Sequence, residues 1–168
     1  MERKKYTRAG VALRLLCALY CLFIFAVLFV GRRGSQPQFE SFELYMRDCF
    51  NVIPFVRIYE FCTQIIDGGD YVRMWAIRNM LGNLLLFYPL GIFLPCLFQG
   101  MRTLRQNMKI SFCTILSVET IQLLLRVGCF DVDDIILNMT GWMLGFLTFS
   151  IPVVRQCLKK CFLEEKQY

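Results

Sequence analysis

Four long apolar segments constrain this chain more than any other feature of its sequence. A helix needs roughly 17–25 mostly apolar residues to cross a bilayer, and three of the segments meet that length. The third has 16 residues, and the long side chains of Lys109 and Arg126 beside it can extend it by reaching to the membrane surfaces. We therefore predict an all-α membrane protein with four transmembrane helices. The predicted spans are 10–30, 80–98, 110–125 and 135–154.

The 168 residues are predicted to form a single membrane domain. Hydrophobic residues make up 57% of the chain, against about 45–50% in soluble domains. The formal net charge of +6 does not indicate a nucleic-acid-binding protein, because the basic residues flank apolar blocks instead of forming one solvated face. We interpret the first segment as a retained signal anchor, because it is longer than a signal-peptide core and lacks an A-x-A cleavage site.

The distribution of Lys and Arg predicts the orientation in the cell membrane. Both terminal tails and the loop between spans two and three are basic, whereas acids balance the basic residues of the first long loop. Because basic loops stay in the cytoplasm, we expect both termini there, with 31–79 and 126–134 facing outward. Arg32 and Arg33 argue mildly against this orientation. The basic residues on the cytoplasmic side are Arg3, Lys4, Lys5, Arg8, Arg102, Arg105, Lys109, Arg155, Lys159, Lys160 and Lys166.

The first long loop contains a predicted amphipathic helix. Between Pro54 and Ile66 apolar residues recur at helical spacing, and Arg57 and Glu60 lie on the other side. Such a helix either lies in the outer membrane interface or packs on the helix bundle. Residues 67–70, "DGGD", indicate a turn before the second span, and Pro89 indicates a kink within that span.

Histidine is absent and cysteine is frequent. The lack of histidine excludes a Ser-His-Asp triad and His-based zinc sites. The nine cysteines show no metal-knuckle spacing, and several lie in apolar runs where a small polarizable side chain packs well. A Cys49–Cys62 bridge is one possibility. We expect no metal and no cofactor, because the run "DVDD" matches no calcium loop and no phosphate cradle accompanies it.

Polar residues from three predicted spans converge on the outer half of the membrane. Within each span they lie three or four residues apart, which places them on one helix face. Glu119 lies about 9 Å below the outer end of its span at ~1.5 Å per residue. We predict that these residues and the aspartates of the last outer turn form one outward-facing polar cavity. The predicted cavity residues are Asn79, Asn83, Glu119, Gln122, Arg126, Asp131, Asp133, Asp134 and Asn138.

Polar groups within membrane spans have two competing explanations. Hydrogen bonds between helices, worth about 0.6 kcal/mol each on average, suffice for the two asparagines of the second span. For the group around Glu119 we favour a functional site, although an Arg126–Asp134 ion pair would account for part of it. Gly141 and Gly145 lie four residues apart and indicate close helix packing.

Four motifs of the sequence resemble the VanZ-like family of bacterial membrane proteins. They are "NVIPF" at 51–55, "RNMLGNLLLFYPLG" at 78–91, "SVETIQ" at 117–122 and "FDVDDIILNMTGWMLG" at 130–145. The motifs occur in the family's order and at similar spacing, and they define a family-like core over 51–145. The departures are small. Cys129 stands where some relatives have arginine, and Met139 separates Asn138 from the threonine and glycine that follow directly in some relatives.

The resemblance implies a small multi-span protein with a link to reduced susceptibility to glycopeptide antibiotics, teicoplanin in particular. Our first hypothesis is a cell-envelope protein whose polar cavity binds a membrane lipid, a lipid-linked cell-wall precursor or the glycopeptide. A second is a membrane enzyme that acts on an envelope lipid, with Glu119 as its acid or base. A third is a small transporter. A protein without any antibiotic role in its host also fits the sequence, which does not reveal the oligomeric state.

Overall fold

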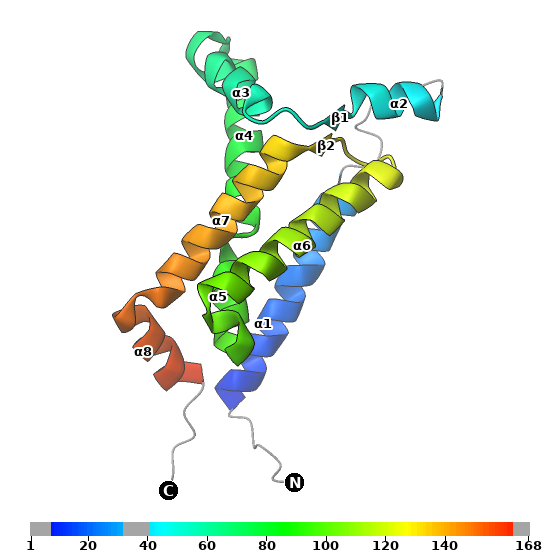
Figure 1. Cartoon of the computed structure of the whole chain (residues 1–168). Coiled ribbons are helices and arrows are strands. Elements are labelled where there is room, and N and C mark those ends of the chain that lie inside the picture. The colour runs from blue at the N-terminus through cyan, green and yellow to red at the C-terminus, as the bar shows by residue number, and fades with distance from the viewer. Residues whose placement is uncertain (1–7, 32–40, 163–168) are drawn as a thin grey trace, which may run out of the picture.

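Helices form nearly all of this structure, a computed structural model that describes residues 8–31 and 41–162. The all-α class predicted from the sequence is confirmed, and the two strands are only two residues long. In chain order the elements are α1 (Arg8–Phe25), the π-helix η1 (Ala26–Val30), α2 (Phe42–Asp48), β1 (Phe50–Asn51), α3 (Val56–Asp67), α4 (Asp70–Leu86), α5 (Tyr88–Leu97), the 3₁₀-helix η2 (Gln99–Arg102), α6 (Leu104–Leu124), β2 (Phe130–Asp131), α7 (Val132–Ser150) and α8 (Pro152–Phe162) (Figure 1).

Two helical segments of the described chain are long and apolar enough to cross a membrane. They are Ala9–Val30, with 22 residues, and Asp70–Leu97, with 28 residues. A third candidate is the pair Val132–Ser150 and Pro152–Leu158, which is bent by 80°. α6 has 21 residues but is not among these candidates, because it carries polar side chains along most of its length. The described chain therefore has two or three candidate spans, where the sequence predicts four.

Prolines set helix boundaries inside the second and fourth predicted spans. The helix breaks at Phe87, so that Pro89 becomes the second residue of α5, where its missing N–H breaks no helical hydrogen bond. The fourth predicted span, 135–154, runs past the end of α7 at Ser150, where the chain turns into α8. Pro152 starts that new helix, since its ring cannot continue the backbone bonding of α7.

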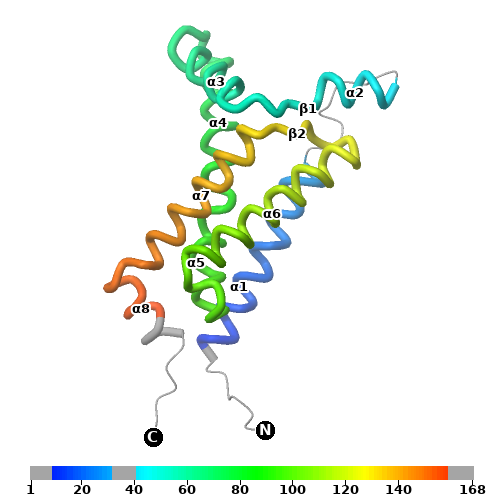
Figure 2. The backbone as a smooth tube through the Cα atoms, in the orientation of Figure 1, coloured from blue at the N-terminus to red at the C-terminus, as the bar shows by residue number. Residues whose placement is uncertain are grey.

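A pair of short parallel strands joins two distant parts of the chain. β1 pairs with β2, with Phe50 opposite Phe130 and Asn51 opposite Asp131. The two phenylalanine rings stack with their centroids 5.1 Å apart. Figure 2 shows this pair, with α2 and α3 on either side of it, at the end of the molecule opposite the two termini. The sequence predicted α3 and the turn after it, but neither α2 nor the strands.

A disulfide between Cys49 and Cys129 continues the strand pairing. The two cysteines are 80 residues apart in sequence, and their Cα atoms lie 4.4 Å apart. The suggested Cys49–Cys62 bridge is wrong, because Cys62 is a free cysteine of α3. We call β1, β2 and this disulfide the clasp. The end of the molecule that holds it is the clasp end, and the opposite end is the terminal end.

α7 packs closely against α4 and α5 because glycines remove side chains from their interface. A Cβ atom added to Gly141 would collide with the carbonyl oxygen of Leu84, and one added to Gly145 would collide with that of Tyr88. On α5, Gly91 approaches the backbone of α7 in the same way. This close packing positions the polar side chains of α4 and α7.

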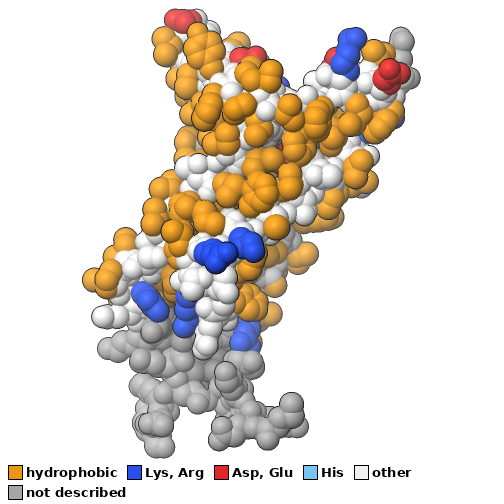
Figure 3. All heavy atoms as spheres, viewed as in Figure 1, with side chains coloured by type: hydrophobic (Ala, Val, Ile, Leu, Met, Phe, Trp, Pro, Cys, Tyr) orange, Lys and Arg blue, Asp and Glu red, His pale blue; other side chains and the backbone are white. Residues whose placement is uncertain are grey.

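Charged side chains are distributed unevenly along the molecule. On the face shown in Figure 3, hydrophobic side chains cover the middle, Lys and Arg gather toward the terminal end, and charges of both signs lie at the clasp end. The described basic residues of η2, the start of α6 and α8 are Arg102, Arg105, Lys109 and Arg155. Basic positions 3–5, 32, 33 and 166, and the side chains of positions 8, 159 and 160, lie outside the described part.

Candidate functional site

Asp133 connects the start of α7 to the start of α3. Its Oδ1 accepts a hydrogen bond from the backbone N–H of Phe55 at 2.5 Å, and its Oδ2 accepts one from Ile58 at 3.1 Å. Phe55 has a left-handed backbone, with φ 69°, which is uncommon for a residue with a side chain. Asp133 is fully buried. Both of its oxygens are therefore engaged in holding α3 in place.

Asp131 connects the clasp to α7 and α3. Its Oδ1 accepts from the N–H of Asp133 at 2.9 Å, which caps α7, and from Nδ2 of Asn51 at 3.2 Å. Its Oδ2 lies 3.3 Å from Nε of Arg57. The same guanidinium pairs with Glu60 at 3.1 Å. Reasoning from the sequence missed Asn51 and Arg57 as partners of Asp131, although Asn51 begins the "NVIPF" motif.

Arg126 ends α6 through its backbone. It has a left-handed conformation with φ 54°. Its N–H donates to the carbonyl of Leu123 at 3.1 Å, and the N–H of Val127 donates to that of Gln122 at 3.0 Å. This is the Schellman pattern, which usually places glycine where Arg126 stands. Arg126 therefore sets the direction in which the chain leaves α6.

The side chain of Arg126 packs on aromatic rings of α2. Its guanidinium carbon lies 4.9 Å from the ring centre of Phe42 and 5.9 Å from that of Tyr45. In the described residues it forms no ion pair with Asp134, so that alternative is wrong. Burial raises the pKa of the Tyr45 phenol, although Arg126 acts in the opposite direction. The phenol therefore stays protonated at neutral pH and donates to the carbonyl of Gly128.

The two asparagines of α4 have different partners. Asn83 is buried, and its Nδ2 donates to Oδ1 of Asp134 on α7. Asn79 is half-buried, and its Nδ2 donates to the carbonyl of Trp75 in its own helix at 2.8 Å. Only Asn83 therefore forms a hydrogen bond with α7.

Gln122 connects α6 to the π-helix at the end of the first span. It is fully buried, and its Nε2 donates to the carbonyl of Leu28 at 2.9 Å. Leu28 lies in η1, and π-helical turns are rare and frequent at functional sites. The apolar sequence of η1 gave no signal of this contact.

Several polar residues are buried on α6 and α7, among them three of the predicted cavity residues near the clasp end of these helices. Glu119, Gln122 and Asn138 have exposed fractions of 3%, 0% and 2%. Oε1 of Gln122 and Oδ1 of Asn138 accept no hydrogen bond from the described residues. Buried acceptors in proteins almost always have a donor. These two oxygens can therefore accept a hydrogen bond from a donor outside the described chain, such as a water molecule or a ligand.

The predicted cavity residues thus fall into two groups and one outlier, Asn79. Those of the first group, Arg126, Asp131 and Asp133, are engaged in contacts that build the clasp end. Those of the second group lie on α4, α6 and α7, and a direct hydrogen bond joins Asn83 to Asp134. We call this second group the buried polar set. It consists of the buried Asn83, Glu119, Gln122 and Asn138 and of Asp134, which is half-buried.

The buried polar set offers carboxyl and amide groups in apolar surroundings. Such groups can accept hydrogen bonds from a polar ligand, and a carboxyl group can also exchange a proton. In the part of the chain that the structure describes, no three His, Cys, Asp or Glu side chains are arranged to hold a metal ion. The set therefore provides hydrogen-bond acceptors and carboxyl groups between helices.

The helical fold, the apolar candidate spans and the buried polar side chains define a membrane protein. A family model described as VanZ/LLP1 matches residues 15–154. The chain belongs to this family, which confirms the resemblance seen in the sequence. Protein VanZ of Enterococcus faecium is 32% identical over 98 residues, which are 57% of this chain and 59% of that protein. The chain thus spans less than two thirds of that relative. No solved structure matches it.

Proposed function

We propose that the chain forms one VanZ-like domain that crosses the membrane four times, with the clasp end outside and both termini in the cytoplasm. The basic residues of the terminal end support this orientation. The clasp disulfide supports it too, because disulfides persist in oxidising compartments. α6 has 21 residues. At ~1.5 Å per residue it is about as long as the ~30 Å hydrocarbon core is thick.

We infer that the protein binds an envelope lipid or a lipid-linked cell-wall precursor through the buried polar set. The observation that carries this inference is the pair of buried amide oxygens, on Gln122 and Asn138, that accept no hydrogen bond from the described residues. Hydroxyl and amide N–H groups of an envelope precursor are donors that such oxygens can accept. The carboxyl groups of Glu119 and Asp134, which lie on the same two helices as these amide oxygens, add charge or further hydrogen-bond acceptors.

This binding would lower susceptibility to glycopeptides such as teicoplanin. Glycopeptides act at the outer membrane surface on lipid-linked precursors, and the proposed orientation directs the buried polar set toward that surface. The VanZ/LLP1 family membership supports this role, since the family resemblance carries the link to teicoplanin. A precursor held in the protein would be less accessible to the antibiotic.

The test replaces each carboxyl group by its amide. We expect wild-type protein to raise the teicoplanin concentration needed to inhibit a susceptible bacterium, and Glu119→Gln and Asp134→Asn to remove that protection. Both changes keep the shape of the side chain and remove its charge. Minimal inhibitory concentrations are measured at equal amounts of membrane-inserted protein.

Thr140→Val is the matched control. Thr140 is exposed on α7, and its hydroxyl donates only to the carbonyl of Ile136 in the same helix. This variant should protect as the wild type does. If both amide variants also protected fully, the proposed role of the buried polar set would be wrong.

A membrane enzyme is the second candidate, and the buried carboxyl group of Glu119 favours it. A carboxyl group can act as the acid or base of a reaction. Purified protein incubated with labelled envelope lipids would then give a new product that Glu119→Gln abolishes. Intact lipids after long incubation with the wild type would contradict this candidate.

A further inference from the structure

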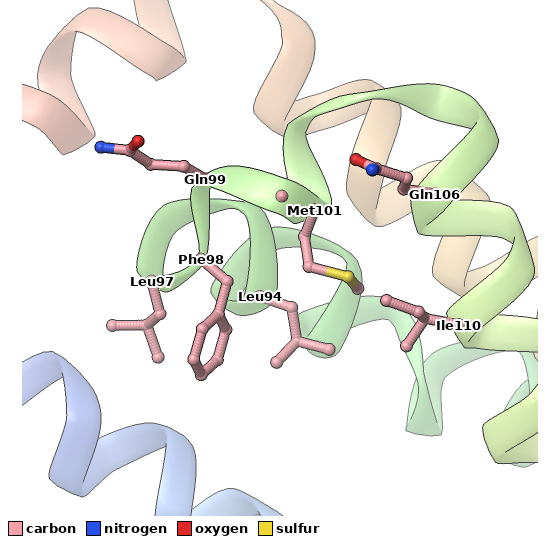
Figure 4. A pocket seen from close by; sticks show the side chains of 8 residues that line it. Leu94, Leu97, Phe98, Gln99, Met101, Gln106 and Ile110 are labelled. Atoms are coloured by element: carbon pink, nitrogen blue, oxygen red, sulfur yellow. The ribbon is translucent and has the colours of Figure 1, made fainter.

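Three hollows follow one another along one face of α6. The first, of about 660 Å³, lies between the end of α5, η2 and the start of α6 (Figure 4). The second, of about 330 Å³, shares Gln106 and Ile110 with the first. The third, of about 620 Å³, shares Thr114 with the second and is lined on its other side by Phe25 and Phe29. Neighbouring hollows share lining residues, and we call this row of three hollows the α6 groove.

The α6 groove has the length of a membrane. Its lining residues on α6 and just beyond run from Gln106 to Leu125, which is about 28 Å at ~1.5 Å per residue. The hydrocarbon core of a bilayer is ~30 Å thick. The lining of the groove therefore extends along α6 over about the thickness of the hydrocarbon core.

The walls of the groove suit a hydrocarbon chain. Leu94, Leu97 and Phe98 line the first hollow, and their side chains are drawn in Figure 4. Two polar groups of the lining have partners within the protein. Ser117 Oγ donates to the carbonyl of Cys113 at 2.7 Å, and Gln106 Oε1 accepts from a neighbouring threonine at 2.9 Å. An occupant need not supply hydrogen bonds to these groups.

Two cations lie beside the groove at its terminal end. Lys109 lines the second hollow, and Arg105 lies one helical turn before it on the same side of α6. Both side chains are exposed, and neither forms a hydrogen bond or an ion pair within the described part of the chain. Arg102, by contrast, is held by the carbonyl of Pro95 at 3.0 Å. An apolar groove with unpaired cations at one end matches a lipid with an anionic head group.

We propose that the α6 groove binds an anionic phospholipid. One acyl chain lies along the groove, and the phosphate lies beside Arg105 and Lys109 at its terminal end. This site is distinct from the buried polar set, and the proposal does not depend on what that set binds. It assigns to the protein a specific lipid that stays with α6 instead of exchanging freely with the bilayer.

Native mass spectrometry of the purified full chain tests the proposal. The protein is incubated in detergent with equal amounts of phosphatidylglycerol and phosphatidylcholine, and the retained lipids are counted. The wild type should retain phosphatidylglycerol in preference. Lys109→Gln should reduce that preference about fivefold, because one cation near a lipid head group contributes ~1 kcal/mol. Arg155→Gln, which removes an exposed cation from α8, should keep the wild-type preference.

A second pair of variants tests the apolar part of the site. Ile110 lines both of the first two hollows, so Ile110→Trp should fill their junction and abolish lipid retention. Leu147→Trp adds the same ring to an exposed position of α7 and should retain lipid. The proposal is wrong if the wild type retains both lipids equally, if Lys109→Gln and Arg155→Gln behave alike, or if Ile110→Trp retains lipid. A lipid-free dimer would assign the groove to a second copy instead.

Discussion

Adjacent residues of this chain have different roles that their sequence positions do not reveal. Asp133 and Asp134 are neighbours in α7, but successive side chains of a helix point about 100° apart. Asp133 therefore binds the backbone at the start of α3, whereas Asp134 binds Asn83 on α4. The first aspartate positions a neighbouring helix, and the second belongs to the candidate site. The sequence "DVDD" alone does not show which aspartate positions a helix and which belongs to the candidate site.

The glycines allow a prediction at this same scale. Gly141→Ala should destabilise the protein by roughly 1–3 kcal/mol, the usual cost of overpacking, because its Cβ would collide with the Leu84 carbonyl oxygen. Thermal unfolding in detergent, followed by circular dichroism, measures the effect. Gly82→Ala is the control, because a Cβ at this helical position would meet no atom within 4 Å. It should be neutral or stabilise by roughly 0.5–1 kcal/mol. Equal effects of the two variants would contradict the close packing of α7 on α4.

Among the elements, the clasp is the one that depends most on its surroundings. A two-residue strand pair is too short to be stable alone. β1 and β2 are held by the disulfide, by the stacked rings of Phe50 and Phe130 and by the Asn51–Asp131 hydrogen bond. The clasp in turn connects the loop before α3 to the loop before α7. This connection sets the position of α3 at the clasp end.

Counting reactive thiols tests the clasp. Denatured protein treated with a maleimide reagent should show two more labelled cysteines after reduction than before it. Cys49→Ser and Cys129→Ser should each remove that difference, and Cys62→Ser should keep it. Loss of the difference in Cys62→Ser would mean that Cys62 takes part in the bridge. In the chain-entropy treatment, a bridge that closes an 80-residue loop stabilises by up to about 4 kcal/mol. The free energy of unfolding of Cys49→Ser and of Cys129→Ser should be lower than that of the wild type by up to this amount.

For the whole molecule, α7 is the element around which the others are arranged. It contacts α3, α4, α5, α6 and α8. Asp134 and Gly141 face α4, and Gly145 faces α5. Trp142 reaches α6, where its Nε1 donates to Oδ1 of Asn107 at 3.0 Å. A polar contact between two helices strongly favours one packing arrangement in a membrane, because lipid offers the polar groups no other hydrogen-bond partners. The arrangement places the polar groups of three helices inside one bundle.

Reporter fusions test the proposed orientation of the whole molecule. Alkaline phosphatase, which is active only outside the cytoplasm, should be active when inserted between Gly68 and Gly69 and inactive at the C-terminus. The insertion site is the turn between α3 and α4, where a Cβ at Gly69 would meet no atom within 4 Å. A fluorescent protein that folds only in the cytoplasm should give the opposite pattern. Phosphatase activity at the C-terminus would overturn the proposed topology.

Local patterns predicted the elements whose cause is local. The amphipathic run of Pro54–Ile66 became α3, and "DGGD" became the turn after it. The 80° bend before Pro152 was missed, because the apolar run continues through it and hydropathy does not register a change of direction. The clasp was missed because its partners are 80 residues apart, and no spacing rule connects them.

The sequence by itself determined the helical membrane character, the family and the set of polar residues worth examining, because apolar length and motif order are properties of the chain alone. Only the tertiary structure decided which of those residues meet. It engaged Asp131, Asp133 and Arg126 in building the clasp end and left Glu119, Gln122 and Asn138 buried on α6 and α7. The physical reason is that the spacing of residues along a helix shows which side chains share a buried face. Which side chains on other helices they contact depends on how the separate helices pack.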